Sequence, residues 1–259
     1  MARKVLLGIT GRHLARLEDV LYPRGTSPHD YLAHYAREFS AVELSESDLQ
    51  SLGPQGLKRC VEVTPPDFRF SIKQHLELEH SWERTVAAMR DLIKPIVEGG
   101  KLGVVVAGLP SWFQYSQSSR KQLATLCECL KDLPLAIEFN RSDWYRKRVV
   151  DGLRTRGVAM VSVQTDSPGA AAMPAHAQVT AAFAYFRFMG RHIRYHLHRV
   201  NMYYEDCRYL PEELAPWADR IASIAKWAHA YVFFQHHQDA SDLYSARLFR
   251  RLLGHVDSL

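Results

Sequence analysis

The sequence has little of several features that would place it in a special class of protein. Its four cysteines form no Cys-x-x-Cys pair, so a zinc ribbon, a redox pair and a disulfide framework are not predicted, and we expect reduced thiols. The longest apolar run, residues 102–109, is far shorter than the roughly 20 residues that cross a bilayer. Only three apolar residues follow Arg3 and Lys4, too few for the core of a signal peptide. We therefore expect a cytoplasmic protein without membrane contact.

Several motifs that identify enzyme classes are also missing. The chain has no P-loop, no Gly-x-Ser-x-Gly elbow, no Gly-x-Gly-x-x-Gly fingerprint and no His-Glu-x-x-His pair. Nucleotide hydrolysis at a Walker site and serine-hydrolase chemistry are therefore unsupported. No repeat or low-complexity linker divides the chain, so we predict one domain over residues 1–259.

What the sequence does contain is the composition of an ordinary globular protein. Its 259 residues are 47% hydrophobic and 24% charged, which is enough to bury a large core. Lys and Arg number 33 against 28 Asp and Glu, for a net charge of +5, which gives a mild attraction to polyanions. This length is also usual for a (β/α)8 barrel.

Eight short runs rich in β-branched or aromatic residues alternate with helical stretches. They begin near Val5, Val42, Phe68, Leu102, Leu135, Val158, Phe183 and Tyr231. A helix over 82–98 has Ser81 as its N-cap candidate and Gly99 at its end, and Gly157 ends another helix. Eight strands separated mostly by helices predict an α/β fold, a single (β/α)8 barrel of the TIM type.

Polar residues recur late in the predicted strands. Residues two apart in a strand share a face, and barrel enzymes place their sites at the carboxyl ends of the strands. In the second strand, for example, Glu43 opposes Val42 and Leu44. The mouth of the barrel is predicted to be lined by Glu43, Ser45, Lys73, Glu138, Asn140, Gln164, Asp166, Arg187 and Gln235.

Short segments of a known pattern recur along nearly the whole chain. They are Gly8 to Gly11, Leu21-Tyr22-Pro23, Tyr35-Ala36, Phe39, Val42-Glu43, Phe68 to Lys73, Glu79-His80, Lys101-Leu102-Gly103, Leu109-Pro110, Glu138-Phe139, Trp144, Asp166, Tyr185 to Gly190 and Tyr231 to His237. In this order and spacing they resemble the YecE-like family, whose proteins carry domain of unknown function 72. The resemblance implies a (β/α)8 barrel, but it supplies no activity because the reaction of the family is not established.

The chain departs from the family pattern at several positions near the predicted mouth. Members commonly have Arg and His where this chain has Asn140 and Arg141, and a His where it has Met189. An Asn pair is replaced by Gln235 and His236. These changes predict either a different ligand or the loss of an activity that the relatives possess.

Three acidic residues are the candidates for catalysis. Glu43, Glu138 and Asp166 are predicted to face the mouth, where carboxylates could transfer protons or bind a metal ion. The alternative for the two glutamates is an ion-pair network with Lys73 and Arg187, because buried charges persist when they are paired. A site and a salt bridge can also coexist.

The ligand-binding candidates are mainly cationic or neutral polar residues. Lys73 and Arg187 suit a carboxylate or phosphate, since Lys is a point charge and Arg a planar fork. The full set of ligand-binding candidates is Lys73, Asn140, Arg187, Gln235, His237 and His80.

Four histidines lie at or just beyond predicted strand ends: His75, His80, His236 and His237. Imidazole there could move protons or bind metal near neutral pH. A divalent metal is therefore left open as a cofactor, although no motif supports one, and no other cofactor is predicted. Hydrogen-bonded histidines in loops are the alternative.

The connection after the seventh predicted strand interleaves cations and aromatics. Arg191, Arg194, Tyr195 and Arg199 form a pattern typical of nucleic-acid-binding surfaces. Acidic residues at 205–206 interrupt the run, and a solvated loop or a partner-binding edge is the other interpretation.

These patterns lead to one hypothesis and two alternatives. The leading hypothesis is a barrel that binds an anionic, phosphate-containing small molecule at its mouth and acts as a hydrolase or lyase. The first alternative is a non-enzymatic barrel that binds nucleic acid through the basic loop, residues 191–199. The second, a binder of neutral sugars, predicts aromatic platforms in the mouth and no role for Lys73. The sequence predicts neither the substrate nor the oligomeric state.

Overall fold

The computed structural model of the protein describes residues 4–11, 17–27, 30–76, 82–164, 178–190, 208–235 and 240–256. These residues contain eight strands, β1 (Val5–Ile9), β2 (Ala41–Ser45), β3 (Arg69–His75), β4 (Leu102–Gly108), β5 (Leu135–Glu138), β6 (Ala159–Gln164), β7 (Phe183–Phe188) and β8 (His229–Phe234). Each strand begins within two residues of its predicted start. The β-branched and aromatic runs therefore identified every strand correctly.

Within the described ranges, a helix follows every strand except β6. The helices are α1 (Tyr31–Tyr35), α2 (Glu46–Val63), α3 (Trp82–Glu98), α4 (Gln117–Cys129), the short 3-10 helix η2 (Ser142–Trp144), α5 (Lys147–Thr155), α6 (Pro211–Ala225) and α7 (Ser241–Val256). Gly100 and Gly157 have φ of 66° and 65°, the left-handed conformation in which glycine terminates helices. The predicted stops after α3 and α5 are thus confirmed. None of the helices in these ranges is long and apolar enough to span a membrane.

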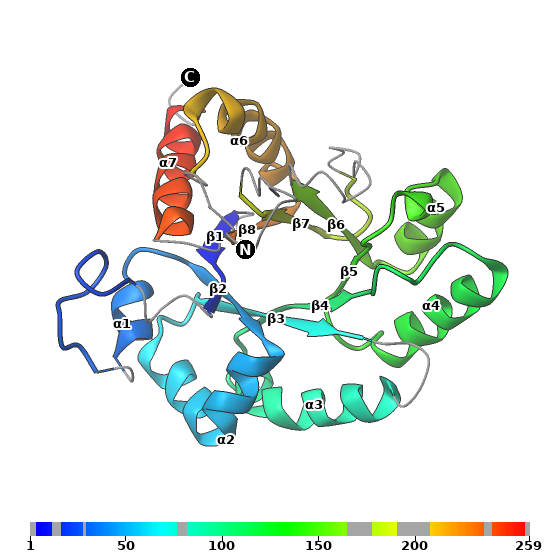
Figure 1. The fold of residues 1–259 in the computed structure, drawn as a ribbon, viewed down its shortest axis with the longest axis horizontal. Coiled ribbons are helices and arrows are strands. Elements are labelled where there is room, and N and C mark those ends of the chain that lie inside the picture. Colours follow the sequence, from blue (N-terminus) through cyan, green and yellow to red (C-terminus); the bar gives the residue numbers. More distant parts are fainter. Residues whose placement is uncertain are drawn as a thin grey trace, which may run out of the picture.

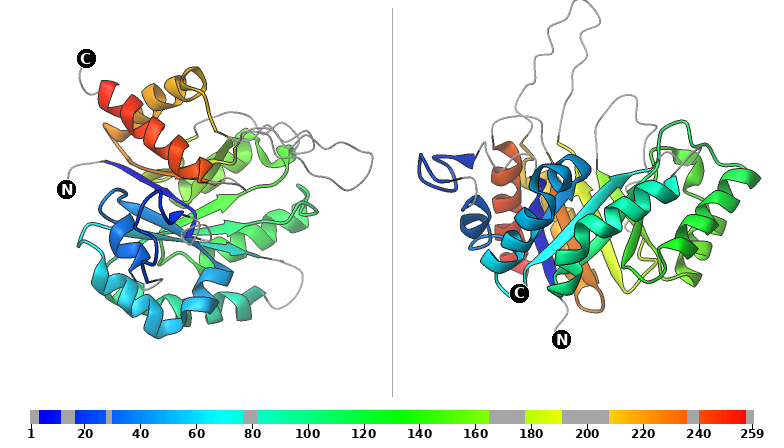
Figure 2. Two further views of the ribbon diagram at one scale, coloured as in Figure 1. Left: turned by 60° about the vertical axis from the view of Figure 1, so that its left-hand side comes forward. Right: turned by 90° about the horizontal axis from the view of Figure 1, so that it is seen from below.

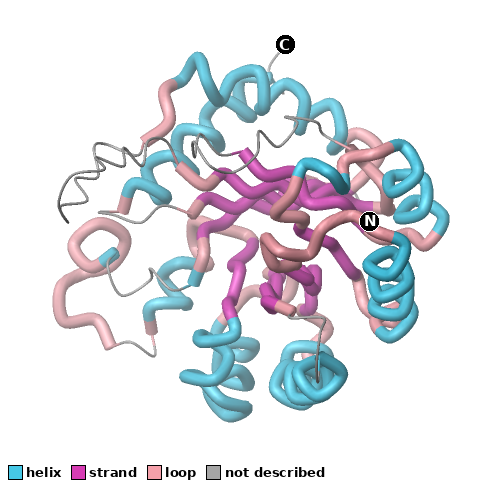
Figure 3. Tube along the Cα trace, turned by 45° about the vertical axis from the view of Figure 1, so that its right-hand side comes forward, coloured by secondary structure: helices cyan, strands magenta, loops and turns pink. Residues whose placement is uncertain are grey.

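The eight strands form one parallel sheet in the order β1-β8-β7-β6-β5-β4-β3-β2. A bridge between Thr10 and Glu43 brings the two end strands together, so the sheet curls into a nearly closed barrel. The helices lie in a ring around the strands (Figures 1 and 2). Figure 3 shows the same arrangement, with the magenta strands enclosed by cyan helices. The predicted (β/α)8 barrel is confirmed.

The seam between β1 and β2 is closed by a side chain. The Ile9 N–H donates to the Tyr35 hydroxyl at 2.8 Å, and this hydroxyl donates to the Ala41 carbonyl at 2.8 Å. The backbones approach so closely here that a Cβ on Gly8 would lie 1.9 Å from the Ala41 oxygen. Only glycine fits at that position, and its absent side chain lets the barrel close.

Two separate apolar cores support the barrel. The larger one joins the outward faces of the strands to the surrounding helices. The smaller one consists only of strand residues and fills the barrel itself: Leu6, Ala41, Val104, Val106, Ala136, Ala159, Val161, Tyr185, Tyr231 and Phe233. The interior is therefore a packed apolar plug rather than a pore, as is usual in this fold.

The predicted inward faces hold for most strands, but the face predicted for β6 is wrong. Val161 pairs with Tyr185 and Val163 with Arg187, and paired residues of parallel strands share a face. The valines therefore face the interior, and Gln164 lies on the opposite side from the predicted mouth. The physical reason is that Val161 belongs to the apolar cluster of the barrel interior, where a glutamine amide would be buried without partners, while Gln164 is only half-buried.

Candidate functional site

A layer of buried charged side chains lies on top of the apolar plug. Glu43, Lys73, Glu138 and Arg187 come from β2, β3, β5 and β7 and are 2%, 8%, 4% and 2% exposed. Three of them follow an interior residue at a spacing of two, as in the pairs Ala41 and Glu43, Ala136 and Glu138, and Tyr185 and Arg187. Because residues two apart in a strand share a face, these charged side chains also face the interior, and they lie at one level at the carboxyl end of the barrel.

These four side chains form one ion-pair network. Arg187 Nη1 lies 2.7 Å from Glu138 Oε2, and its Nη2 lies 3.0 Å from Glu43 Oε1. Lys73 Nζ donates to Glu138 Oε1 at 2.7 Å. The convergence predicted from the sequence and the predicted ion pairing are both present, since two cations and two carboxylates balance each other.

Two neutral side chains complete the layer. The Tyr185 hydroxyl donates to Glu43 Oε2 at 2.7 Å, and Arg187 Nη2 donates to Gln235 Oε1. Gln235 is among the site residues that the sequence predicts, whereas Tyr185 is not. The signal that could have identified Tyr185 is its position two residues before Arg187, which puts both on the same strand face.

The electrostatics of the layer keep Glu138 and Arg187 ionised. Burial raises the pKa of Glu138, but the charges and hydrogen bonds of Arg187 and Lys73 outweigh it and hold that pKa at about 2. Burial lowers the pKa of Arg187, yet Glu138 and Glu43 raise it overall. Glu138 is therefore an anion at neutral pH, which favours a role in holding the two cations rather than in carrying a proton.

Some polar atoms at the mouth have no partner among the described residues. Arg187 Nε and Thr10 Oγ1 are both buried in this state. Lys73 Nζ uses one of its three hydrogens for Glu138. Buried donors without partners call for an explanation, and a bound ligand or water is one.

His75 extends this surface toward solvent. It is the last residue of β3, two positions beyond Lys73 on the same face, and it is exposed. Burial of the ring and the charge of Lys73 lower the pKa of His75. A neutral imidazole therefore stands beside the ammonium group at neutral pH.

Other predicted residues of the mouth have local structural contacts. Asn140 is exposed, and its Nδ2 donates to the Leu109 carbonyl at 2.6 Å, which ties the loop after β5 to the end of β4. Arg141 pairs with Asp143 of η2 at 3.1 Å. Ser45 caps α2 in a capping box with Asp48. These side chains support the loops around the mouth.

The remaining predicted site residues lie outside the described residues. They are Asp166, His80, His236 and His237, together with Arg191, Arg194, Tyr195 and Arg199 of the basic loop. Three of the four histidines considered as metal ligands are among these residues. Within the part of the chain that is described, no group of three or more His, Cys, Asp or Glu residues gathers.

Comparisons with known proteins agree with this architecture. Residues 6–258 match the family described as "Protein of unknown function DUF72". The UPF0759 protein YunF of Bacillus subtilis (strain 168) is 25% identical over 136 residues, a segment that covers 49% of this chain and 48% of that protein. The match thus spans about half the length of this relative.

Two solved structures are similar over nearly the whole chain. A DUF72 family protein from Thermotoga maritima MSB8 is 25% identical with a TM-score of 0.82, and the alignment covers 97% of this chain and 99% of that one. A DUF72 family protein from Enterococcus faecalis V583 is 20% identical with a TM-score of 0.78, covering 97% and 98%. The second likeness concerns the fold alone.

Proposed function

The chain belongs to the DUF72 family, and within that uncharacterised family we propose that it binds a small anionic, phosphate-containing ligand at the carboxyl-end mouth of its barrel. The observation that carries the proposal is the unpartnered Nε of Arg187, buried in a guanidinium whose other nitrogens are all held by neighbours. A ligand oxygen at this nitrogen would satisfy the donor.

Lys73 is the second group that would bind the ligand. Glu138 orients its ammonium, and the two remaining hydrogens have no acceptor in the described ranges. Of the four charged residues of the layer, Lys73 is the most exposed. The Lys73 ammonium and the Arg187 guanidinium together offer a point charge and a fixed N–H to a phosphate group.

The carboxylates of Glu43 and Glu138 stabilise the two cations inside the barrel. Without Glu43 and Glu138, two buried cations would face each other with a large desolvation cost. With them, Arg187 donates to three acceptors, on Glu138, Glu43 and Gln235. The cations are thereby preorganised before a ligand arrives, which reduces the cost of binding.

A hydrolytic or lyase-type reaction at this site would also need a proton carrier. The low pKa of Glu138 makes it a weak base. His75 is accessible, its pKa is lowered, and it stands two residues from Lys73 on the same strand face. We assign proton transfer to His75 and charge support to Glu138, with Glu43 fixing Arg187 and Tyr185.

The test is a calorimetric titration of the protein at low ionic strength, once with inorganic phosphate and once with glycerol 3-phosphate. Wild type should bind at least one probe saturably, and Lys73→Gln should weaken binding about tenfold or more, because a hydrogen bond to a charged group is lost. Lys4→Gln is the matched control, since Lys4 precedes β1 at the opposite end of the barrel and pairs with Asp67.

Circular dichroism should show that both variants are folded. Equal binding by wild type and Lys73→Gln would contradict the proposal. It would also be refuted by the absence of saturable binding of either probe to the wild-type protein.

A further inference from the structure

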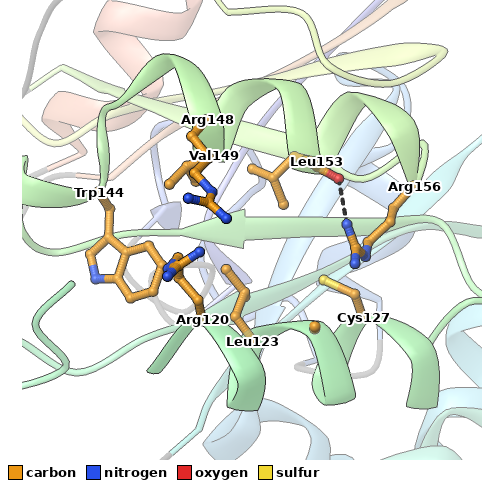
Figure 4. A pocket seen from close by; sticks show the side chains of 10 residues that line it. Arg120, Leu123, Cys127, Trp144, Arg148, Val149, Leu153 and Arg156 are labelled. Carbon is orange, nitrogen blue, oxygen red and sulfur yellow. Dashed lines mark hydrogen bonds between the residues drawn. The ribbon is translucent and has the colours of Figure 1, made fainter. Parts of the chain in front are cut away.

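A cavity lies outside the barrel, between α4 and α5 (Figure 4). Its volume is about 270 Å³. Ten residues line it, among them the arginines Arg120, Arg148 and Arg156. It shares none of its lining residues with the charged layer at the mouth.

The floor of the cavity is apolar and well packed. Leu123, Cys127, Val149 and Leu153 are each less than 8% exposed. Trp144 closes one end, and its indole is held in place by stacking on Phe139 and by donating Nε1–H to the Phe113 carbonyl at 2.7 Å. These side chains form a rigid apolar surface that could receive a ring or a branched chain.

Three arginines surround this floor, and no carboxylate lines the cavity. In Figure 4, Arg120 on α4 and Arg148 on α5 point toward one another across the space between the helices. The Nε of Arg120 is buried without a partner among the described residues. Arg156 is already engaged, since its Nη1 donates to the Gly152 carbonyl at 3.0 Å. Cations gathered in this way repel each other unless an anion joins them.

Charges elsewhere on α5 are treated differently. Lys147 and Arg154 both pair with Asp151, at 2.5 Å and 3.0 Å. Neither of these cations lines the cavity. Asp151 thus pairs with the two cations of α5 that lie outside the cavity, whereas Arg148 has no ion pair among the described residues. The solvent-exposed guanidinium of Arg148 is therefore open to an external anion.

Gly152 supplies an independent observation. It lies inside α5 without a positive φ, and a Cβ there would meet nothing closer than Arg156 Nη1 at 3.8 Å. Neither the backbone conformation nor packing therefore requires glycine, which weakens a helix interior. The absent side chain leaves the cavity open.

We propose that this cavity binds a small amphiphilic carboxylate, with its apolar body against Leu123, Val149 and Trp144 and its carboxylate between Arg120 and Arg148. The planar fork of arginine matches a carboxylate in two parallel hydrogen bonds. The volume limits the body to about the size of one ring or a short branched chain. This site is independent of the proposed function at the mouth.

The test is a titration with phenylacetate. Calorimetry measures the affinity, and a two-dimensional NMR spectrum records the indole N–H signals. The wild-type protein should bind phenylacetate saturably, and binding should shift one indole signal. The Trp144→Phe variant, which lacks that signal, assigns it to Trp144. Arg148→Gln should weaken binding about tenfold or more. Gly152→Leu should abolish binding, because its side chain fills the cavity from a helical position that tolerates leucine.

Arg154→Gln is the matched control, since it removes one positive charge from the same helix outside the cavity. It should bind phenylacetate like wild type. Phenylacetamide and inorganic phosphate test the two halves of the ligand, and both should bind more weakly than phenylacetate. The proposal is overturned by unchanged affinity in Arg148→Gln or Gly152→Leu, by equal binding of the amide or of phosphate, or by the absence of saturable binding to wild type.

Discussion

Arg187 is the residue on which the buried charges of the barrel depend. Its guanidinium is the only group that contacts both Glu43 and Glu138 among the described residues, and it also binds Gln235. Removing one partner of a buried ion pair leaves the other charge uncompensated, which is much more costly than losing an exposed pair. The stability of the mouth and its candidate ligand site therefore rest on the same side chain.

A double-mutant cycle tests this dependence. Arg187→Met should lower the free energy of unfolding by about 3–5 kcal/mol, because two buried carboxylates lose their shared cation. Adding Glu43→Gln removes one of those carboxylates, so the double variant should lose less than the sum of the two single losses. Urea denaturation gives the free energy of unfolding of the wild type, the two single variants and the double variant. Additive losses would show that the two residues are not coupled.

Glu138 gives the network a characteristic dependence on pH. Its folded-state pKa of about 2 lies below the ordinary value of 4.5, so the stability it contributes is fully present above about pH 4.5 and is lost as the pH falls toward about 2. Glu138→Gln should be less stable at neutral pH but should lose less stability on acidification. Denaturation midpoints across this range provide the measurement, and parallel profiles for the two proteins would contradict the assignment.

At the scale of elements, β1 and β2 are joined by an isolated bridge rather than by a ladder of backbone hydrogen bonds. The hydroxyl of Tyr35, from α1, occupies the place of a direct ladder bond between Ile9 and Ala41. The ring itself is fully buried and stacks on Phe39. A helix side chain therefore completes the hydrogen bonding of the sheet at the point where the closing strands meet.

Tyr35→Phe removes this hydroxyl while keeping the packed ring. We expect a loss of about 2 kcal/mol or more, because an N–H and a carbonyl are left buried without partners. Tyr145→Phe is the control, since that buried hydroxyl has no hydrogen-bond partner in the described ranges, and it should change stability little. Chemical denaturation compares the variants, and an equal effect of both would argue against the bridging role.

At the scale of the whole molecule, the first strand and the last helix of the described residues pack together to complete the barrel. α7 packs on both β1 and β8, and its Leu243, Ala246 and Phe249 are fully buried. Arg247 of α7 also binds both oxygens of Glu38, at 2.7 Å and 2.8 Å. The last helix thus covers the strand that begins the barrel.

Removing α7 should therefore unfold the entire barrel rather than one edge of it. A chain that ends at Ala240 exposes the apolar faces of β1 and β8, and we expect no cooperative thermal transition by circular dichroism. Arg247→Ala is the graded comparison and should cost only about 1 kcal/mol, because its pair with Glu38 is partly exposed. A truncated protein with a wild-type transition would refute this account.

Much of the architecture could be predicted because its causes are local. Strand starts follow from β-branched and aromatic runs, and helix ends follow from glycines such as Gly157. The inward positions of Glu43, Lys73, Glu138 and Arg187 follow from the two-residue period. The face of β6 could not be obtained in this way, because Val161 and Val163 alternate with Ser162 and Gln164, and only the pairing with Tyr185 and Arg187 decides which set faces the interior.

The sequence by itself determined the barrel, the level at which its charges lie and the types of side chain at the mouth, since each depends on neighbours in the chain. Only the tertiary structure decided that Arg187 joins Glu43 to Glu138, residues separated by 144 and 49 positions. It also decided that Arg120 and Arg148 share a cavity beside Gly152. These contacts depend on distances set by the closure of the barrel and the packing of its helices, which no local pattern records.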